Sequence, residues 1–204
     1  MSNKREMVTF KAKVFDYLNP NSGSICIEDI AHHLALVNRY NGSTKMPYSV
    51  AEHSVRMSYM TVGEPLLNLL HDAAEAYIGD VIGPQKKGLK WSSPSGGFDV
   101  EYKQVEMEIL RQIGKALDIP DLKSWLSMPE HIKKADVIMY VTEIRDLLPP
   151  QAMDLLREQG WMPDDVEPLP QMIIPWPWHM AENEFLSRYR ELSGGNLTNE
   201  HIHH

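Results

Sequence analysis

Four side chains that suit a metal ion stand out in this sequence. His71 and Asp72 are adjacent, His53 precedes them, and Asp136 follows them. Two imidazoles and two carboxylates form a mixed nitrogen and oxygen set that suits one divalent cation. If the fold brings them together, the chain holds the donors of a hydrolase that activates water. The plainer alternative is structural, because a lone inward histidine is more often hydrogen-bonded within a core than bound to metal.

The spacing of these residues sets what the fold must do. Adjacent helical residues point about 100° apart, so His71 and Asp72 reach one ion together only where helices pack closely. His53 must then come from a second helix and Asp136 from a third. Inward ionisable groups are costly unless they are paired or bound, which favours a metal site over four unrelated structural residues.

Hydrophobic periodicity predicts the helices that carry the histidines. A capping box of Ser49 and Glu52 begins one helix and places His53 on its apolar face. The next helix begins near Pro65 and ends before Gly79. The His-Asp pair falls inside this second helix, and the glutamate three residues after the pair projects beside it.

The chain further on is expected to supply the fourth donor. Residues 83–97 are rich in Gly, Ser, Pro and Lys and predict the longest loop, a candidate lid over a site. A long helix is expected from Phe98 to Ala116. Ser127 and Glu130 predict a second capping box, and the helix after it places Asp136 at the margin of an apolar stripe.

The whole pattern predicts an all-α fold, a compact multi-helix bundle with a short N-terminal hairpin or irregular lead-in. The remaining helices are expected at 28–39, near 151–159 and near 179–192. No repeat or internal boundary is evident, so residues 1–204 are expected to form a single domain. Residues 25–146 are expected to form its core and residues 147–193 a C-terminal helical extension. Residues 194–204 are expected to be a disordered tail outside the site.

Composition narrows the classes of function. The formal charge is −8, from 20 Lys and Arg against 28 Asp and Glu, and binding to nucleic-acid polymers calls for a basic face instead. The single cysteine, Cys26, leaves no disulfide framework or cysteine-based zinc site within the chain. We expect no signal peptide and no membrane span, which needs roughly 18 consecutive apolar residues. These features predict a cytoplasmic protein.

Short motifs occur in a fixed order along residues 25–146. They are Asn38-Arg39-Tyr40, the run Tyr48 to Val55, His71-Asp72-Ala73-Ala74-Glu75, Gly79-Asp80, and Ala135-Asp136. Together they resemble the HD-domain phosphohydrolases, and most closely the bacterial and phage branch that includes 5′-deoxynucleotidases, phage dATP hydrolases and the oxetanocin phosphohydrolase. The resemblance implies an HD-domain bundle and metal-dependent hydrolysis of nucleotide phosphates.

The resemblance also implies a role for each matched residue. One divalent ion, cobalt, manganese or magnesium, would lower the pKa of its bound water. Its ligands would be His53, His71, Asp72 and Asp136. Glu75 would activate or orient the attacking water, and Asp80 would protonate or orient the leaving oxygen. The plainer alternatives are a solvated Glu75 and an ordinary loop Asp80.

Substrate contacts follow from the same resemblance. Arg39 would bind the substrate phosphate, because a guanidinium fork fits a phosphate edge. Lys86 would contact the same phosphate, and Lys87 is a second candidate for that contact. The plainer alternative is that both lysines are solvated loop residues. Tyr40 stands where the deoxynucleotidase pattern has an indole, and Ile82 stands where it has proline. Both positions adjoin the expected sugar and phosphate region, so the substrate is left open.

The predicted function is hydrolysis of a purine 2′-deoxynucleotide or nucleoside-analogue mono-, di- or triphosphate by metal-activated water. The partner is therefore a small-molecule nucleotide, with homo-oligomerisation left open. The alternative is a noncatalytic nucleotide-sensing or interaction module that retains the metal site. Guanosine tetraphosphate hydrolases carry an acidic residue where this chain has Ala76. Cyclic dinucleotide phosphodiesterases need extra histidines, and only His131 lies between Asp72 and Asp136.

Two further groups of residues have structural and functional interpretations. Glu143, Arg145 and Asp146 form a charged cluster after Asp136, interpreted mainly as a structural ion network. Trp176 and Trp178 could stack a base, but packing against the core is the expected role.

Overall fold

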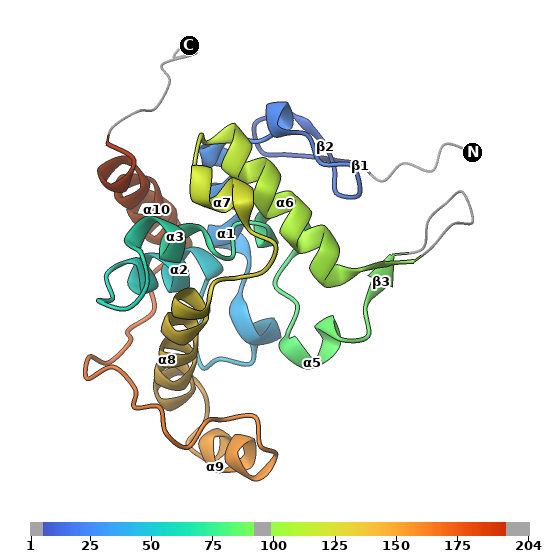
Figure 1. The fold of residues 1–204 in the computed structure, drawn as a ribbon. Helices are drawn as coiled ribbons and strands as arrows, with labels where there is room; N and C mark the ends of the chain where they lie inside the picture. Colours follow the sequence, from blue (N-terminus) through green and yellow to red (C-terminus); the bar gives the residue numbers. More distant parts are fainter. Residues whose placement is uncertain (1–5, 92–98, 195–204) are drawn as a thin grey trace.

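The structure is a computed structural model that describes residues 6–91 and 99–194 (Figure 1). It is mostly helical, with two small two-stranded antiparallel sheets. This confirms the expected all-α bundle with a short N-terminal hairpin. The predicted tail lies outside the described residues except for Gly194. No described helix is long and apolar enough to cross a membrane.

The N-terminal hairpin leads into the first helix. Strands β1 (Glu6–Val8) and β2 (Val14–Asp16) pair with Met7 opposite Phe15. Helix α1 (Ile27–Leu36) ends three residues before the predicted limit of 39. The cause is the extended backbone of Val37, whose carbonyl accepts the N–H of Val50. The chain therefore leaves the helix to contact the start of the next one.

Helix α2 (Val50–Ser58) begins at the predicted residue. The Ser49 hydroxyl accepts the N–H of Glu52 at 3.2 Å, which satisfies one free donor of the first turn. The other half of the expected capping box is absent, because the Glu52 carboxylate accepts hydrogen bonds from Arg56 and from the backbone N–H of Trp176. Glu52 therefore joins α2 to the segment that precedes α10.

The predicted helix from Pro65 to Gly79 is split in two. Helix α3 spans Pro65–Leu70, and helix α4 spans Glu75–Ile78. Between them the backbone bonds join residues three apart, as in a 3₁₀ turn. Gly79 ends α4 with a φ of 77°, a conformation that glycine adopts without strain.

The expected loop over 83–97 contains regular structure. Helix α5 (Gly83–Lys86) has a proline in its first turn, and strand β3 (Lys90–Trp91) pairs with β4 (Val100–Glu101). Helix α6 (Tyr102–Ala116) begins at Tyr102 rather than at Phe98. Residues 92–98 lie outside the described residues, and so does the corresponding part of the predicted lid.

After α6, the described residues form four more helices. They are α7 (Pro120–Ser124), α8 (Glu130–Leu147), α9 (Gln151–Glu158) and α10 (Trp178–Leu192). The helices expected near 151–159 and 179–192 are confirmed. The second capping box is wrong, because α8 begins after Pro129 and its first turn has no side-chain cap. Glu130 is thus the first helical residue, too early to close a box with Ser127.

One large core and two smaller clusters hold these elements. The large core draws buried side chains from α1, α2, α3, α6 and α10. Helices α1, α2, α3 and α10 lie side by side in Figure 1. Helix α10 contributes Ala181, Phe185 and Tyr189, so it packs with the first helices. The smaller clusters lie along α8 and join it to the segment that follows. Helix α8 therefore packs against residues 148–173, which lie between it and α10 in the sequence.

Candidate metal centre

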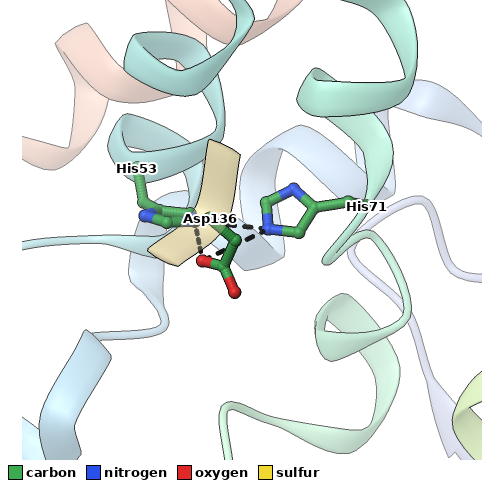
Figure 2. Close-up of side chains that lie close together, drawn as sticks. All are labelled: His53, His71 and Asp136. Atoms are coloured by element: carbon green, nitrogen blue, oxygen red, sulfur yellow. Dashed lines mark hydrogen bonds and ion pairs between the residues drawn. The ribbon is translucent and has the colours of Figure 1, made fainter. Parts of the chain in front are cut away.

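Two buried imidazoles face each other at the centre of the site. His53 projects from α2 and His71 from the turn after α3, and their Nε2 atoms lie 3.3 Å apart (Figure 2). The Nδ1–H of His71 donates to the carbonyl of Asn68 at 2.8 Å. The Nδ1–H of His53 donates to the carboxylate of Glu143 at 2.6 Å. With Nδ1 hydrogen-bonded in this way, both Nε2 atoms point to the same place, where each can bind a cation in its deprotonated form. Glu143 and Asp136 raise the pKa of His53 to about 9 against the opposing effects of burial and Arg39, so a cation would displace a proton there.

Two carboxylates reach the same point. Asp136 Oδ1 lies 3.4 Å from His53 Nε2 and 3.9 Å from His71 Nε2. Asp72 Oδ2 lies 3.1 Å from His71 Nε2 and 3.7 Å from His53 Nε2. Ligand atoms of His53, His71 and Asp136 all fall within 4.8 Å of one another, as in a group that could hold a metal ion. His53, His71 and Asp136 therefore form the group, and Asp72, the fourth predicted donor, lies beside both imidazoles.

This donor set fits a divalent cation. Ligands about 2.1 Å from an ion lie about 3.0 Å apart at neighbouring octahedral positions and about 3.4 Å apart in a tetrahedron. The observed separations of 3.1–3.9 Å are close to these values. The donors do not select among divalent metals.

The charges around the donors keep the carboxylates ionised. Burial alone would raise the pKa of Asp72 and of Asp136, because it disfavours the charged form. The facing imidazoles outweigh burial and hold both pKa values below the usual range, with Arg39 adding to the effect at Asp72. Both aspartates are thus available as anionic ligands.

Glu143 supports the site from behind, a role that the sequence did not reveal. It is wholly buried, with one carboxylate oxygen on His53 and the other accepting from Arg39 Nε at 3.2 Å and from the Tyr40 hydroxyl. Burial opposes ionisation of Glu143, but Arg39 and His53 lower its pKa to about 2. The available signal was spacing, since Glu143 lies two helical turns after Asp136 and so shares its face of α8.

The predicted charged cluster of Glu143, Arg145 and Asp146 is therefore divided. Arg145 and Asp146 pair with each other and bind the backbone of the C-terminal segment. Arg145 donates to the carbonyl of Leu169 at 2.6 Å, and Asp146 accepts the N–H of Ile173 at 2.8 Å. These two residues form the expected structural network, whereas Glu143 belongs to the candidate site.

Arg39 lies within the site but is already paired. Its guanidinium bridges Asp72 at 3.3 Å and Glu143 at 3.2 Å. The next two residues, Tyr40 and Asn41, have φ angles of 58° and 50°, which is a rare conformation for residues with side chains. Two such residues in succession turn the chain so that the Tyr40 hydroxyl reaches Glu143. Backbone strain of this kind is characteristic of functional sites.

Glu75 and Lys86 form a second layer beside the donors. Glu75 is buried, and its Oε1 accepts from Lys86 Nζ at 3.2 Å. Among the residues that the structure describes, its Oε2 has no hydrogen-bond partner. Burial and the nearby Asp72 raise the pKa of Glu75, and burial raises that of Asp80. Lys86 also donates to Glu106 at 2.8 Å.

These groups open into a cavity of about 410 Å³, within the range of small-molecule sites. Its charged end is lined by Arg39, Asp72, Glu75, Asp80, Lys86 and Asp136. Tyr40 and Ile82, the two positions that depart from the deoxynucleotidase pattern, also line the wall. Lys87 does not: its side chain is exposed and lies outside the cavity lining. The structure therefore brings together every predicted site residue except Lys87 and places the imidazoles behind them.

The two tryptophans singled out in the sequence lie elsewhere. The guanidinium of Arg56 lies over the Trp176 ring at 4.5 Å, and Glu52 accepts the Trp176 backbone N–H. Neither Trp176 nor Trp178 lines the cavity. The tryptophan that does is Trp161, in the segment after α9.

Fold and site define a helical protein with a His/Asp centre suited to a divalent cation, next to a cavity of small-molecule size. The chain is 33% identical over 188 residues to YfdR of Escherichia coli strain K12, described as an uncharacterized protein. The match covers 91% of this chain and 94% of YfdR, so the chain belongs to the YfdR family.

A second relative matches a shorter part of the chain. An uncharacterized protein of Rhodobacter capsulatus is 45% identical over 84 residues, which is 36% of this chain and 43% of that protein. No protein-family model matches the chain.

Proposed function

We propose that this protein is a metal-dependent phosphohydrolase of the HD-domain type that cleaves nucleotide phosphates. One observation carries the proposal: Glu75, whose buried Oε2 has no hydrogen-bond partner among the described residues, lines the same cavity as Asp72 and Asp136 of the metal centre. A buried carboxylate oxygen without a hydrogen bond is costly in a fold. A role in holding the attacking water accounts for that cost.

Each of these side chains has its own role in the proposed reaction. A divalent cation held by the four donors would neutralise charge on the phosphate and lower the pKa of water. In its ionised form, which Lys86 on Oε1 favours, Glu75 takes the proton as the water oxygen bonds to phosphorus. Asp80, whose pKa burial raises, returns a proton to the leaving oxygen as the ester or anhydride bond breaks.

The positive groups at the charged end favour a phosphate there. Arg39 and Lys86 are the cations among the lining residues and lie beside the carboxylates of Asp72, Glu75, Asp80 and Asp136, so a divalent cation on the donors would complete the positive charge that a phosphate needs. Their pairing with Asp72, Glu143, Glu75 and Glu106 orders both side chains. Little side-chain entropy is then lost when the phosphate binds.

The resemblance to deoxynucleotidases makes purine 2′-deoxynucleotides the first substrates to assay. Tyr40 and Ile82 lie on the cavity wall, so their departure from the deoxynucleotidase pattern bears on which sugar and base fit. The mono-, di- and triphosphate are therefore compared for each nucleoside. The noncatalytic sensor remains the alternative, but nucleotide sensing alone does not need an unpartnered acid at Glu75.

The deciding experiment measures phosphate release from a panel of nucleotides with manganese, cobalt or magnesium. Wild-type protein should turn over at least one nucleotide, and Glu75→Gln should retain its metal while losing at least a hundredfold in kcat. Metal content measured on both proteins separates loss of chemistry from loss of the ion. Absence of turnover across the panel, or full activity of Glu75→Gln, would overturn the proposal.

A further inference from the structure

The cavity has an apolar end as well as a charged one. Its apolar lining includes Tyr140, Ile144, Leu148, Leu156 and Trp161. Three of these side chains come from the end of α8 and its C-cap, and two come from α9 and the residue that follows its turn. Figure 1 shows α9 beside the C-terminal end of α8. The segment after residue 147, which has no counterpart in the sequence resemblance, therefore builds part of the site.

Helix α8 connects the two ends of the cavity. Asp136, Tyr140 and Ile144 are four residues apart, so they follow one another along one face of the helix. With a rise of 1.5 Å per residue, Tyr140 lies about 6 Å and Ile144 about 12 Å beyond Asp136. A ring joined to a phosphate through one sugar would therefore extend from the donors onto this apolar surface.

The turn after α9 fixes Trp161 beside Leu156. The N–H of Trp161 donates to the Leu156 carbonyl at 2.8 Å, and that of Gly160 donates to the Arg157 carbonyl at 2.9 Å. This pair of bonds is the Schellman motif, which requires a left-handed residue. Gly160 supplies it with a φ of 66°. The motif brings the side chains on either side of the turn together on the cavity wall.

The neighbours of Trp161 anchor it, yet its ring stays accessible. The next residue, Met162, is buried with Val141 and Ile144 in a cluster under α8. Trp161 itself is 58% exposed although it lines the cavity. A large aromatic ring held open at the rim of a cavity marks a binding surface, and its flat face suits another ring.

We propose that this apolar end is the nucleobase subsite and that Trp161 stacks on the base. The inference rests on the proposed function, because the charged end must take the phosphate for a base to reach Trp161. It assigns substrate choice to the chain after α8, whereas the chemistry belongs to the helices before it. Leu156 and Ile144 line the same cavity.

The test compares Trp161→Ala with Trp161→Phe and with Trp178→Ala. Trp178 is a matched control, a tryptophan that is 49% exposed and outside the cavity lining. The ligands are deoxyadenosine 5′-monophosphate and deoxyribose 5-phosphate, which lacks the base. Calorimetric titrations are made in a Glu75→Gln background, so that the nucleotide survives, and KM is measured with Glu75 intact.

Trp161→Ala should weaken deoxyadenosine monophosphate binding about tenfold or more, as removal of a base-stacking platform does. It should leave deoxyribose 5-phosphate unchanged, and Trp161→Phe should recover most of the affinity. Trp178→Ala should match the parent protein. Equal loss for both ligands, no loss for the nucleotide, or no binding of the nucleotide to the parent protein would each overturn the subsite. Selective loss of nucleotide binding without turnover in the wild type would leave the subsite standing while the hydrolase proposal fails.

Discussion

Glu143 and His53 are joined by a wholly buried hydrogen bond of 2.6 Å between Oε1 and Nδ1. This bond keeps the His53 proton on Nδ1 and aims Nε2 at the other donors. Partners of this kind orient a ligand and raise its basicity. The metal centre is thus held from behind by a residue that would not touch the ion.

Replacing Glu143 with glutamine should weaken metal binding. The His53 and Arg39 side chains would then lose the negative charge of the carboxylate that hydrogen-bonds to both. We expect manganese affinity about 10–100-fold lower, the usual effect of losing such a partner, in a calorimetric titration. Asp146→Asn is the control, because Asp146 hydrogen-bonds to Arg145 and Ile173 outside the metal centre. This substitution should lower the stability of the fold and leave manganese affinity unchanged. Unchanged affinity in Glu143→Gln would show that the bond does not tune the centre.

Saturating manganese should stabilise the folded chain. At about 100 times its Kd a ligand adds about 2.7 kcal/mol, which is a rise of about 5–10 °C in Tm for a chain of this size. His71→Ala should abolish the rise. His32→Ala should keep it, because His32 pairs with Glu182 away from the centre. A shift that survives in His71→Ala would place the ion elsewhere.

The only cysteine should react slowly in the folded protein. Burial raises the pKa of the Cys26 thiol to about 11 from 9.0, and the neighbouring Asp29 adds to the effect. Since the thiolate is the reactive form, alkylation by iodoacetamide at pH 8 should be about 100-fold slower than in the unfolded chain. The rate should climb about tenfold per pH unit up to pH 10. Equal rates before and after unfolding would contradict the burial of this thiol.

Gly114 should not tolerate a methyl group. A Cβ at this position in α6 would lie 2.6 Å from the backbone nitrogen of Lys123 and 2.9 Å from the carbonyl carbon of Leu122. Overpacking of this kind costs about 2 kcal/mol, so Gly114→Ala should lower Tm by about 4–8 °C. Gly83→Ala, with open space around its Cβ, should change the free energy of unfolding by less than about 0.5 kcal/mol. Thermal and urea unfolding of both variants decide between these outcomes.

The sequence predicted the four donors because their chemistry is local to each residue. Their convergence followed from apolar stripes that place His53 and His71 inward. Glu143 was missed as a site residue because its role depends on a partner 90 positions away. Trp161 was missed because a turn after α9, and not periodicity, sets its position.

The errors in the predicted elements also have physical causes. The capping box of Ser127 and Glu130 failed because a proline lies between them and sets the start of α8. The split of the helix at His71 was not readable from periodicity, because a short 3₁₀ turn barely shifts the apolar pattern. In the loop predicted for residues 83–97, short elements such as α5 carry too few residues to show a period.

The central claim is that two imidazoles and two carboxylates from separate segments bind one cation. A crystal of the protein grown with manganese, measured for anomalous scattering, tests it most directly. We expect one strong peak bounded by His53 Nε2, His71 Nε2, Asp72 and Asp136. Manganese bound only at other positions, or His53 and Asp136 turned away from the His71-Asp72 pair, would contradict it.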